Sequence, residues 1–569
     1  MNFAAVAHMP DQRYCYCTEP GRFIVRLQTG RGDLSGVILH YQDKYIPVKF
    51  MDTRKKVSMN IVARDAWHDY YEAEISIDVV CLRYFFELCD TNGCVCYYSS
   101  FRFLNEPPTD IDRMYDLPQN LREVQRFQTP EWAKNKVVYQ IFPSRFATTK
   151  DIPEKLWYKA PIKADTDLQW NLRGIIEHLD HIRELGVDIV YMTPIFHSKS
   201  THKYDTIDYY AIDPTFGTTE DLIELVEQAH GMGMRVVLDG VFNHTAPEFF
   251  AFSDLENNWE HSHYRGWYYC DGKPKRPLIR FKKPNYKCFS YHGGMPKLNM
   301  DNPETGDYFI EVARYWMKTA HIDGWRLDVG DEVSHQYWRR FRKALKQEFP
   351  DALIVGEVWH YAADFLQGDT WDSVMNYPFL NAVVDFVANG EITATDFVNE
   401  LGFLRGNLNT ACYPLLWNLI GSHDTPRALH RCNGDKRKLR LMSAMQLLLP
   451  GMPFLYYGDE FGMTGGADPD CRRGMLWDKN RADMELFSFY RRLIALRKQY
   501  PELTEQPPMK VETDDEKGIV IMEFENFVLI FHGGETPCQI NGYIGCKDLI
   551  GNCTFNGEIA SYQSLLIQK

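Results

Sequence analysis

Four acidic residues follow short apolar runs, where a folded chain could gather their carboxylates into one site. They are Asp239, Asp328, Glu357 and Asp424, and Arg326 precedes Asp328 by two positions. Side chains two apart in a strand leave on the same side, so a guanidinium would lie beside the Asp328 carboxylate. An opposite charge favours the ionised form, which can attack an anomeric carbon. This spacing predicts a nucleophile at Asp328.

Glu357 supplies the second carboxyl that cleavage of a glycosidic bond needs. It ends the next apolar run, so it should leave an adjacent strand. Neighbouring acids favour its protonated form, which is the form that a general acid needs. Retaining glycosidases hold two carboxyls about 5–5.5 Å apart, a distance that adjacent strands can provide. Asp424 adds a third acid, placed to stabilise an oxocarbenium-like transition state or to bind sugar hydroxyls.

Each of these features alone has a simpler structural explanation. An Arg-x-Asp at a strand end is more often a structural ion pair, and a Glu after Gly is usually a loop residue. The His-Asp pair at 423–424 would mostly form a local hydrogen bond. Only the arrival of acids at several strand ends of one sheet favours a catalytic site.

The elements that would position these acids alternate between apolar strands and amphipathic helices. Helical patterns such as Thr218–His230 and Pro303–Ala320 separate the strands. This alternation indicates a parallel sheet buried on both faces, and eight units fit a (β/α)₈ barrel, an α/β fold with reactive residues at the C-terminal strand ends. The predicted strands are 137–142, 187–192, 235–239, 322–328, 353–357, 373–376, 416–420 and 453–457.

Two β-rich regions flank the predicted barrel. Residues 1–125 alternate apolar and polar positions between turns, which predicts an N-terminal β-sandwich, and residues 501–569 predict a C-terminal β domain. The barrel spans 126–500 and carries an inserted subdomain, rich in aromatic residues, at about 245–300. The polar stretch 105–130 is the expected linker.

Composition excludes several classes of function. The 569 residues carry a net charge of −14, which argues against nucleic-acid and anionic-membrane partners. No run of about 20 apolar residues occurs, and Met1 to Arg13 lacks a basic segment followed by an apolar run, so we expect neither a membrane helix nor a signal peptide. The 14 cysteines follow no zinc-type spacing, and reduced thiols in a cytoplasmic protein are expected.

Four segments in order along the chain resemble the motifs of the α-amylase superfamily. They are Asp239-Gly-Val-Phe-Asn-His244, Gly324-Trp-Arg-Leu-Asp328, Gly356-Glu-Val-Trp359 and Ser422-His-Asp424. Two more, Met295–Asn299 and Gly465–Gly474, resemble segments of its neopullulanase, cyclomaltodextrinase and maltogenic amylase group. The N-terminal module is similar to the starch-binding-type domain of that group, so the resemblance covers essentially the whole chain.

The resemblance implies a role for each matching residue. Asp328 would be the nucleophile, Glu357 the general acid/base and Asp424 the stabiliser of the transition state. The residues that would bind the sugar at the cleavage point are His244, Arg326, His423 and the stacking platform Tyr204.

Five further residues would act along the cleft. Asp468 and Arg472 would bind a more distant sugar hydroxyl, and Trp359 and Tyr286 would line the leaving-group side. Core packing is the competing explanation for Trp359. Glu332 would influence the choice between water and sugar as acceptor.

The sequence departs from the calcium-binding relatives after the first barrel strand. Those relatives carry an Asn-, Asp- and Gly-rich loop, whereas Phe146–Glu154 has two carboxylates and no glycine. Ca²⁺ takes six to eight oxygen ligands. We therefore expect no cofactor, with the usual calcium site absent or poor.

The sequence predicts a cytoplasmic hydrolase of the cyclomaltodextrinase/neopullulanase kind, cleaving α-1,4-glucosidic bonds with retention. Cyclodextrins and maltooligosaccharides are the expected substrates, with pullulan as a further candidate, and the resemblance implies a homodimer through the N-terminal domain. An α-glucanotransferase or an α-1,6-acting glucosidase with the same acids remains an alternative. A catalytically inactive amylase-like binding protein is a second alternative, which the three retained acids disfavour.

Overall fold

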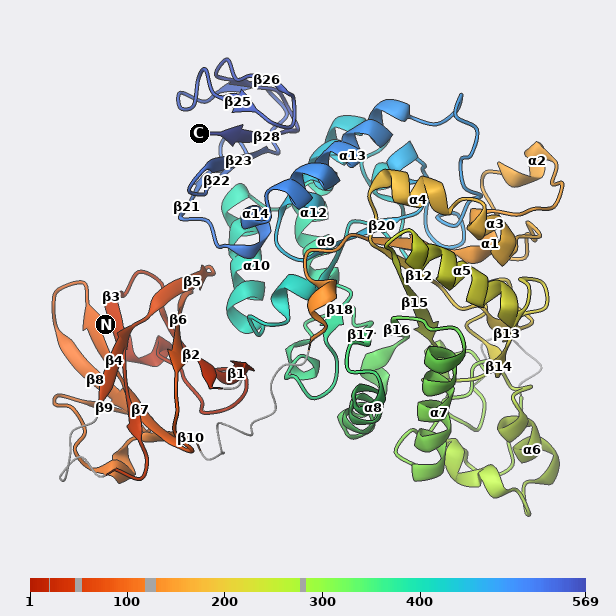
Figure 1. Ribbon diagram of the computed structural model, residues 1–569, viewed down its shortest axis with the longest axis horizontal. Coiled ribbons are helices and arrows are strands. Elements are labelled where there is room, and N and C mark those ends of the chain that lie inside the picture. The colour runs from red at the N-terminus through yellow and green to blue at the C-terminus, as the bar shows by residue number, and fades with distance from the viewer. Residues whose placement is uncertain (20, 47–53, 118–128, 277–282) are drawn as a thin grey trace. The chain divides into compact units, whose positions relative to one another are not determined.

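The computed structural model describes the chain except for residues 20, 47–53, 118–128 and 277–282 (Figure 1). Two compact units are present, and neither is one continuous stretch. The first comprises Met1–Gln128, Ala363–Asp369 and Ile392–Tyr413, and the second comprises Thr129–Ala362, Thr370–Glu391 and Pro414–Lys569. Across the described ranges, every helix is too short or too polar to span a bilayer.

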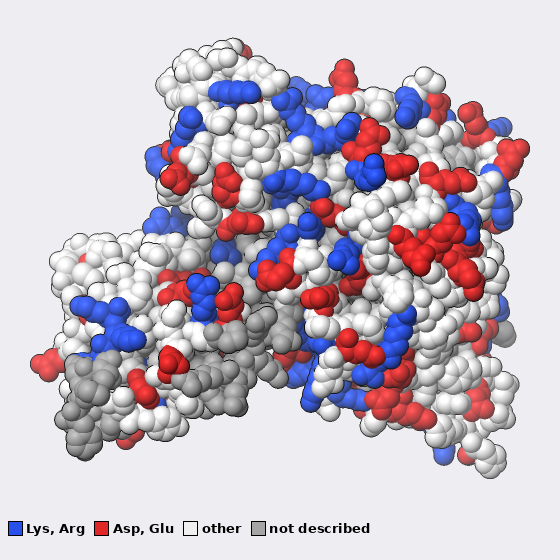
Figure 2. Space-filling view, in the orientation of Figure 1, with Lys and Arg blue, Asp and Glu red and all other residues white. Residues whose placement is uncertain are grey.

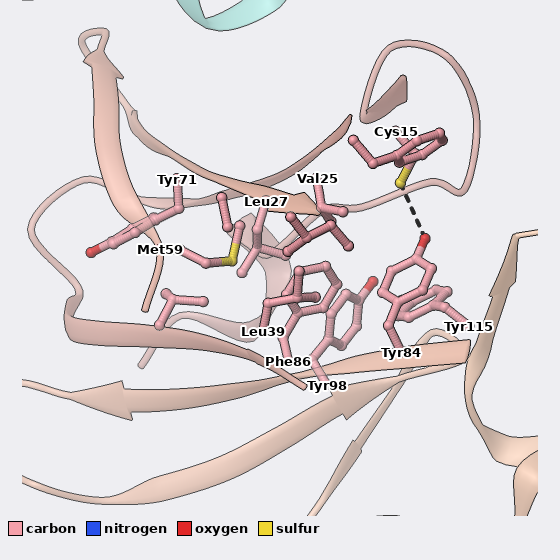
Figure 3. Close-up of a cluster of buried hydrophobic side chains, with 14 of the residues drawn as sticks. Cys15, Val25, Leu27, Leu39, Met59, Tyr71, Tyr84, Phe86, Tyr98 and Tyr115 are labelled. Carbon is pink, nitrogen blue, oxygen red and sulfur yellow. Dashed lines mark hydrogen bonds between the residues drawn. The ribbon is translucent and has the colours of Figure 1, made fainter. Parts of the chain in front are cut away.

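Two antiparallel sheets of the first unit enclose an apolar core. Their orders are β1-β2-β6-β5 and β4-β3-β7-β8-β9, and β10 pairs with β7. Figure 3 shows Val25 and Leu27 of β2 beside Leu39 of β3 and Phe86 of β7, all deeply buried. Since alternate residues of each strand fill this core, the predicted N-terminal β domain is confirmed. The strands are β1 (Cys15–Glu19), β2 (Arg22–Gly30), β3 (Leu34–Asp43), β4 (Lys55–Ser58), β5 (Asn60–Arg64), β6 (His68–Ser76), β7 (Leu82–Asp90), β8 (Val95–Ser99), β9 (Arg102–Leu104) and β10 (Tyr115–Leu117).

The stretch expected to be a linker contains an ordered strand. Tyr115 and Leu117 of β10 are buried, and β10 pairs with β7 through Tyr115 opposite Tyr84. The linker prediction is wrong there because three residues are too few to show an alternating pattern. The predicted boundary at residue 125 lies outside the described residues.

A late segment of the chain packs on the N-terminal β domain. Helix α10 (Ala394–Asn407) approaches β5 and β6 closely at two glycines. A Cβ on Gly402 would lie 1.7 Å from the Arg64 carbonyl oxygen, and one on Gly406 would lie 2.3 Å from the Tyr70 ring. Only glycine allows this approach, so the sequence of α10 is adapted to the domain beneath it.

A buried ion pair joins the same segment to the sheet. Arg26 Nε donates to Glu72 Oε1 (2.8 Å), and its Nη1 and Nη2 donate to the carbonyl oxygens of Gly406 (2.6 Å) and Leu408 (3.0 Å). The Thr410 hydroxyl donates to Glu72 Oε1 (3.1 Å). Each charge therefore has a direct partner in the first unit.

Eight parallel strands form the centre of the second unit. Their order is β18-β17-β16-β15-β12-β11-β20-β19, and a bridge between Met375 and Trp417 joins the two ends. These strands coincide with the eight predicted runs, and the predicted (β/α)₈ barrel is confirmed. They are β11 (Val138–Ile141), β12 (Ile189–Met192), β15 (Arg235–Gly240), β16 (Gly324–Leu327), β17 (Leu353–Gly356), β18 (Ser373–Val374), β19 (Trp417–Leu419) and β20 (Met452–Tyr456).

The barrel helices begin where the sequence supplies caps. Thr218 and Asp221 form a capping box at the start of α5, and Asn302 caps α7 ahead of Pro303. Both helices lie within a residue of their predicted bounds. The helices of this unit are α1 (Pro143–Phe146), α2 (Glu154–Trp157), α3 (Leu172–Ile176), α4 (Leu179–Leu185), α5 (Thr219–Gly231), α6 (Phe250–Asn258), α7 (Pro303–Thr319), α8 (His335–Glu348), α9 (Tyr377–Val383), α11 (Ala428–Arg431), α12 (Lys436–Leu448), α13 (Met484–Gln499) and α14 (Glu502–Glu505).

Strand register brings the acidic residues to one level. Asp239 of β15 pairs with Arg326 of β16, and Leu327 pairs with Gly356 of β17. Asp328 and Glu357 therefore follow the ends of adjacent strands at the same height. This is the arrangement that the Arg-x-Asp spacing predicted.

Two further parts complete the second unit. The insertion between β15 and α7 contains α6 and isolated bridges such as Cys270–Tyr286. The C-terminal domain is an antiparallel sheet of order β21-β22-β23-β28-β25-β26, as predicted. These strands are β21 (Lys510–Asp514), β22 (Ile519–Glu523), β23 (Phe527–His532), β25 (Lys547–Asp548), β26 (Cys553–Thr554) and β28 (Gln563–Gln568).

The surface carries mixed charge. On the face that Figure 2 shows, Lys and Arg side chains are interspersed with Asp and Glu side chains. Together with the net charge of −14, this distribution does not favour a polyanionic partner.

Candidate active site

One buried guanidinium lies at the centre of the barrel mouth. Arg326 Nη1 is 2.9 Å from Asp328 Oδ1 and 3.1 Å from Asp239 Oδ2, while its Nη2 is 2.7 Å from Glu357 Oε1. All four side chains are buried. Arg326 therefore joins the carboxylates at the ends of three neighbouring strands.

Three carboxylates that share one cation are difficult to ionise together. Burial raises the pKa of Asp328 well above its usual range, and the charge of Glu357 adds to the effect, while Arg326 opposes it. Burial also raises the pKa of Asp239 to about 6, again against the effect of Arg326. Arg326 acts on Asp328 in the predicted direction, since its charge lowers the pKa of that carboxyl, but burial and the charge of Glu357 outweigh it.

Two N–H groups orient Glu357. The Val329 backbone donates to Oε2 (2.9 Å), and the Trp359 indole donates to Oε1 (3.1 Å). Val329 has φ 46° and ψ 47°, a strained conformation for a β-branched residue. Gly356 precedes Glu357 where a Cβ would lie 2.2 Å from the Trp371 ring. Local strain and a close ring contact thus fix the second carboxyl.

Trp359 itself is not a core residue. Its side chain is 49% exposed and stacks on the buried Tyr377 ring, with 4.3 Å between ring centroids. The structure places it beside Glu357, where an exposed aromatic face is available to a sugar.

A chain of hydrogen-bond contacts links His423, Tyr204 and Asp239 at the barrel mouth. His423 Nε2 lies 2.5 Å from Tyr204 Oη, whose hydroxyl also lies 3.2 Å from Asp239 Oδ2. The Gln140 amide nitrogen is 2.7 Å from His423 Nδ1, and the Tyr191 hydroxyl donates to Asp239 Oδ2 (2.5 Å). Tyr204 and His423 were predicted from the sequence, whereas Gln140 and Tyr191 were missed. The sequence marks these two residues only as polar side chains within largely apolar strands.

His244 presents an unused polar atom at the end of β15. Its ring is buried and stacks on Phe289 at 5.0 Å, and Nε2 has no hydrogen-bond partner among the described residues. Burial, with the charge of Lys297, lowers the pKa of His244 to about 3. A neutral, unpartnered imidazole nitrogen suits a hydrogen bond to a substrate hydroxyl.

The third predicted acid is held by a neighbouring loop. Arg472 Nη2 is 3.0 Å from Asp424 Oδ1, and its Nη1 is 2.9 Å from Asp468 Oδ1. Arg472 Nε also donates to the His423 carbonyl oxygen (2.8 Å). The side chains of Asp424 and Asp468 are 27% and 49% exposed, so both remain open to solvent and to a ligand.

Glu332 belongs to a polar cluster next to the mouth. It accepts a hydrogen bond from Asn243 Nδ2 (2.9 Å), and Lys297 Nζ lies 4.0 Å away while bonding to Asn243 Oδ1. Burial lowers the pKa of Lys297. Lys297 comes from the Met295–Asn299 segment, which the sequence singled out without assigning it this contact.

Tyr286 lies in the insertion between β15 and α7. It is buried in the insertion, packs on Phe252 at 5.0 Å, and donates its hydroxyl hydrogen to the Gly293 carbonyl oxygen (2.5 Å). Both of these contacts lie within the insertion between β15 and α7. Its place on the leaving-group side stays a prediction.

The loop after the first barrel strand offers few ligands for calcium. Asp151 and Glu154 are both exposed. In the part of the chain that the structure describes, no three His, Cys, Asp or Glu side chains are grouped to hold a metal ion.

Comparisons with known proteins identify the family of this chain. Residues 140–482 match the α-amylase catalytic domain family, and residues 1–119 match the α-amylase N-terminal Ig-like domain family. A cyclomaltodextrinase from a Bacillus species is 40% identical over 507 residues, covering 88% of this chain and 90% of the relative. Neopullulanase 2 from Thermoactinomyces vulgaris is 40% identical over 510 residues, covering 89% and 86%.

The solved structures give the same answer. A cyclomaltodextrinase structure superposes with a TM-score of 0.92 at 35% sequence identity, and the match covers 100% of both chains. The family matches, the identity over most of the chain and the barrel agree. This chain therefore belongs to the α-amylase family, as a glycoside hydrolase of the cyclomaltodextrinase and neopullulanase group.

Proposed function

We propose that the enzyme hydrolyses α-1,4-glucosidic bonds by double displacement with retention of configuration. In the first step an Asp328 oxygen bonds to the anomeric carbon, the glycosidic C–O bond breaks, and Glu357 gives its proton to the leaving oxygen. In the second step Glu357 takes a proton from water, the water oxygen bonds to the same carbon, and the ester to Asp328 breaks. Asp424 stabilises the oxocarbenium-like charge in both steps.

The observation that carries this proposal is the shared contact of Arg326 with Asp328 and Glu357. The reaction needs one proton on this pair, and it needs that proton on Glu357. In the free site burial favours the protonated form of Asp328. A bound glucosidic oxygen beside Glu357 would draw the proton there and leave Asp328 ionised against Arg326 Nη1.

The remaining candidate residues would bind the sugar chain. We assign His244 and His423 to hydroxyls of the sugar at the cleavage point, and Tyr204 to the stacking platform. Asp468 and Arg472 would contact the next sugar along the cleft, since both lie beside Asp424 and remain partly open. These assignments rest on the matched segments and on the contacts described above.

Cyclodextrins and maltooligosaccharides are the proposed substrates, with pullulan as a further candidate. The names of the relatives, a cyclomaltodextrinase and a neopullulanase, support this choice. The test incubates the enzyme with β-cyclodextrin, pullulan and starch in parallel, and reads the products and the anomer formed first by NMR. We expect short maltooligosaccharides released as the α-anomer, fastest from β-cyclodextrin.

Other product patterns would overturn the proposal. Initial β-anomer would contradict retention. Longer chains as the main products from maltotriose would favour a glucanotransferase, and cleavage restricted to α-1,6 bonds would favour the α-1,6-acting glucosidase. Persistent hydrolysis by Asp328→Asn would contradict the assignment of the nucleophile.

We also propose a cytoplasmic homodimer formed through the N-terminal domain. All 14 cysteines are free thiols, as expected in a reducing compartment. Because Ile392–Tyr413 belongs to the first unit, deletion of residues 1–125 would expose its packing face. The test therefore uses the intact chain in sedimentation equilibrium: twice the chain mass is expected, and the mass of one chain at micromolar concentration would contradict the dimer.

A further inference from the structure

Gln140 is a buried amide in the first barrel strand, and its Oε1 has no hydrogen-bond partner among the described residues. It lies on β11, is fully buried, and its side-chain nitrogen is 2.7 Å from His423 Nδ1. His423 is equally buried, after β19. Burying a polar side chain in a barrel interior costs free energy unless the side chain is hydrogen-bonded.

The other side of the imidazole determines which nitrogen carries the proton. His423 Nε2 is 3.1 Å from Asp424 Oδ2, and an ionised carboxylate only accepts hydrogen bonds. Tyr204 Oη, at 2.5 Å, can give its own hydrogen to Asp239 Oδ2 at 3.2 Å and accept from Nε2. Nε2 therefore carries a hydrogen that faces the mouth.

The charge of the ring then fixes the role of Gln140. Burial, followed by the charges of Arg472 and Arg326, lowers the pKa of His423 well below its usual value, so the ring is neutral. A neutral ring with hydrogen on Nε2 has an acceptor at Nδ1, which pairs with the N–H of the Gln140 amide. The charged and titratable groups that face His423 are Tyr204, Asp424, Arg472, Arg326, Glu357 and His202.

We propose that Gln140 is a positioning residue that holds His423 in the Nε2–H form, so that this hydrogen faces Tyr204 Oη and Asp424 at the barrel mouth. This inference rests on the proposed hydrolysis. It adds a residue on the first strand to a site otherwise built from later strands and loops, and it makes the amide, rather than its bulk, the functional part.

The decisive variants are Gln140→Glu and Gln140→Met. A carboxylate at position 140 only accepts, so it moves the neutral ring to the Nδ1–H form and favours the imidazolium. Below the new pKa, Nε2 keeps its hydrogen, whereas above it an Nε2 lone pair faces the Asp424 carboxylate. We expect the kcat/KM of Gln140→Glu on β-cyclodextrin to fall about tenfold or more with rising pH, where the wild-type profile is flat.

Gln140→Met tests the amide without adding charge. Methionine has a similar length but no N–H, so Nδ1 loses its donor while the space stays filled. We expect kcat/KM to fall about tenfold at all pH values with no new alkaline limb. A value within about twofold of wild type overturns the inference, as does a Gln140→Glu profile that superimposes on that of the wild type.

Gln446→Met is the matched control. Gln446 is another buried amide of the same barrel, and it donates to the carbonyl oxygens of Asn418 (3.0 Å) and Phe454 (2.7 Å). It should lose thermal stability with an unchanged pH profile and kcat/KM. An equal loss of kcat/KM in Gln446→Met and Gln140→Met, at equal loss of Tm, would reduce Gln140 to a structural role.

Failure of this inference is distinguishable from failure of the proposed function. A wild-type enzyme that hydrolyses no α-glucan contradicts the function itself. An active wild type whose Gln140 variants keep its profile contradicts only the role of Gln140.

Discussion

Each of the two units buries an arginine against acidic side chains, yet the two arrangements differ in how charge is balanced. In the first unit, Arg26 pairs with one carboxylate, Glu72, and fills its other donors with the carbonyl oxygens of Gly406 and Leu408. In the barrel mouth, Arg326 lies against three carboxylates. The first arrangement is complete in itself, whereas the second has more acid than base.

The pKa values follow this difference in opposite directions. Burial opposes the ionisation of Glu72, but the charges of Arg26 and Arg405 lower its pKa below the usual value. Burial and Glu357 raise the pKa of Asp328. Removing one partner of a satisfied buried pair leaves an unpaired charge and costs stability, while a cluster with more acid than base shifts the pKa values of its acids, as functional sites often do.

The largest expected effect is a loss of kcat at the barrel mouth. Asp328→Asn should lower kcat on β-cyclodextrin by about 10⁴-fold, because it removes the nucleophile while keeping the shape of the side chain. Its Tm at pH 7 should equal or exceed that of the wild type, since it removes a carboxyl group whose ionisation the folded state disfavours. A loss of kcat below about tenfold would contradict the assigned role.

The next largest effect is a loss of stability in the first unit. Arg26→Met should lower the stability of the first unit by about 3–5 kcal/mol in urea unfolding, because it leaves the Glu72 carboxylate buried without its cation. The kcat per folded molecule should stay near the wild-type value. Arg22→Met, at an exposed ion pair with Glu74, is the control and should change stability by less than about 1 kcal/mol.

Glu72 and Asp328 should also contribute to the pH dependence of stability with opposite signs. Glu72 has a lowered folded pKa, so its stabilisation is present above pH 4.5 and is lost as the pH falls. Asp328 has a raised folded pKa. As the pH rises from about 3.8, the unfolded state ionises more readily than the folded state, so stability falls. The Tm advantage of Asp328→Asn should therefore grow between pH 4 and 7, while the Tm deficit of Glu72→Gln should shrink toward pH 4. Equal trends in both variants would contradict the comparison.

The smallest expected effect concerns metal. Dialysis against EDTA should leave kcat and Tm unchanged, because Asp151 and Glu154 are the carboxylates of the loop after the first barrel strand and both are exposed. A drop in Tm of several degrees, reversed by Ca²⁺, would show a site that the carboxylate pattern does not reveal.

The sequence predicted the barrel and its acids because both depend on short-range patterns. Arg326 and Asp328 lie two apart in one strand, and the register between β16 and β17 follows from consecutive parallel strands. Their pKa directions could not be predicted in the same way. Those depend first on burial, and then on the charges that Arg326 and the acids of neighbouring strands exert on one another.

Long-range contacts between unlike elements left no pattern to read. Arg26 and Gly406 are 380 positions apart, and nothing in the sequence of β2 or α10 indicates that the two elements contact each other. Gln140 looked like an ordinary strand residue because its partner, His423, comes from the opposite end of the barrel sequence. The strand β10 was missed because its three residues are too short for an alternation.

The central claim is that Asp328 forms a covalent bond with the sugar. The most direct measurement treats the enzyme with 5-fluoro-α-D-glucosyl fluoride, which slows the second step, and identifies the labelled peptide by mass spectrometry. We expect one fluoroglucosyl group on the peptide that contains Asp328, and none in Asp328→Asn. A label on the peptide that contains Glu357 or Asp424, or inactivation without any covalent label, would contradict it.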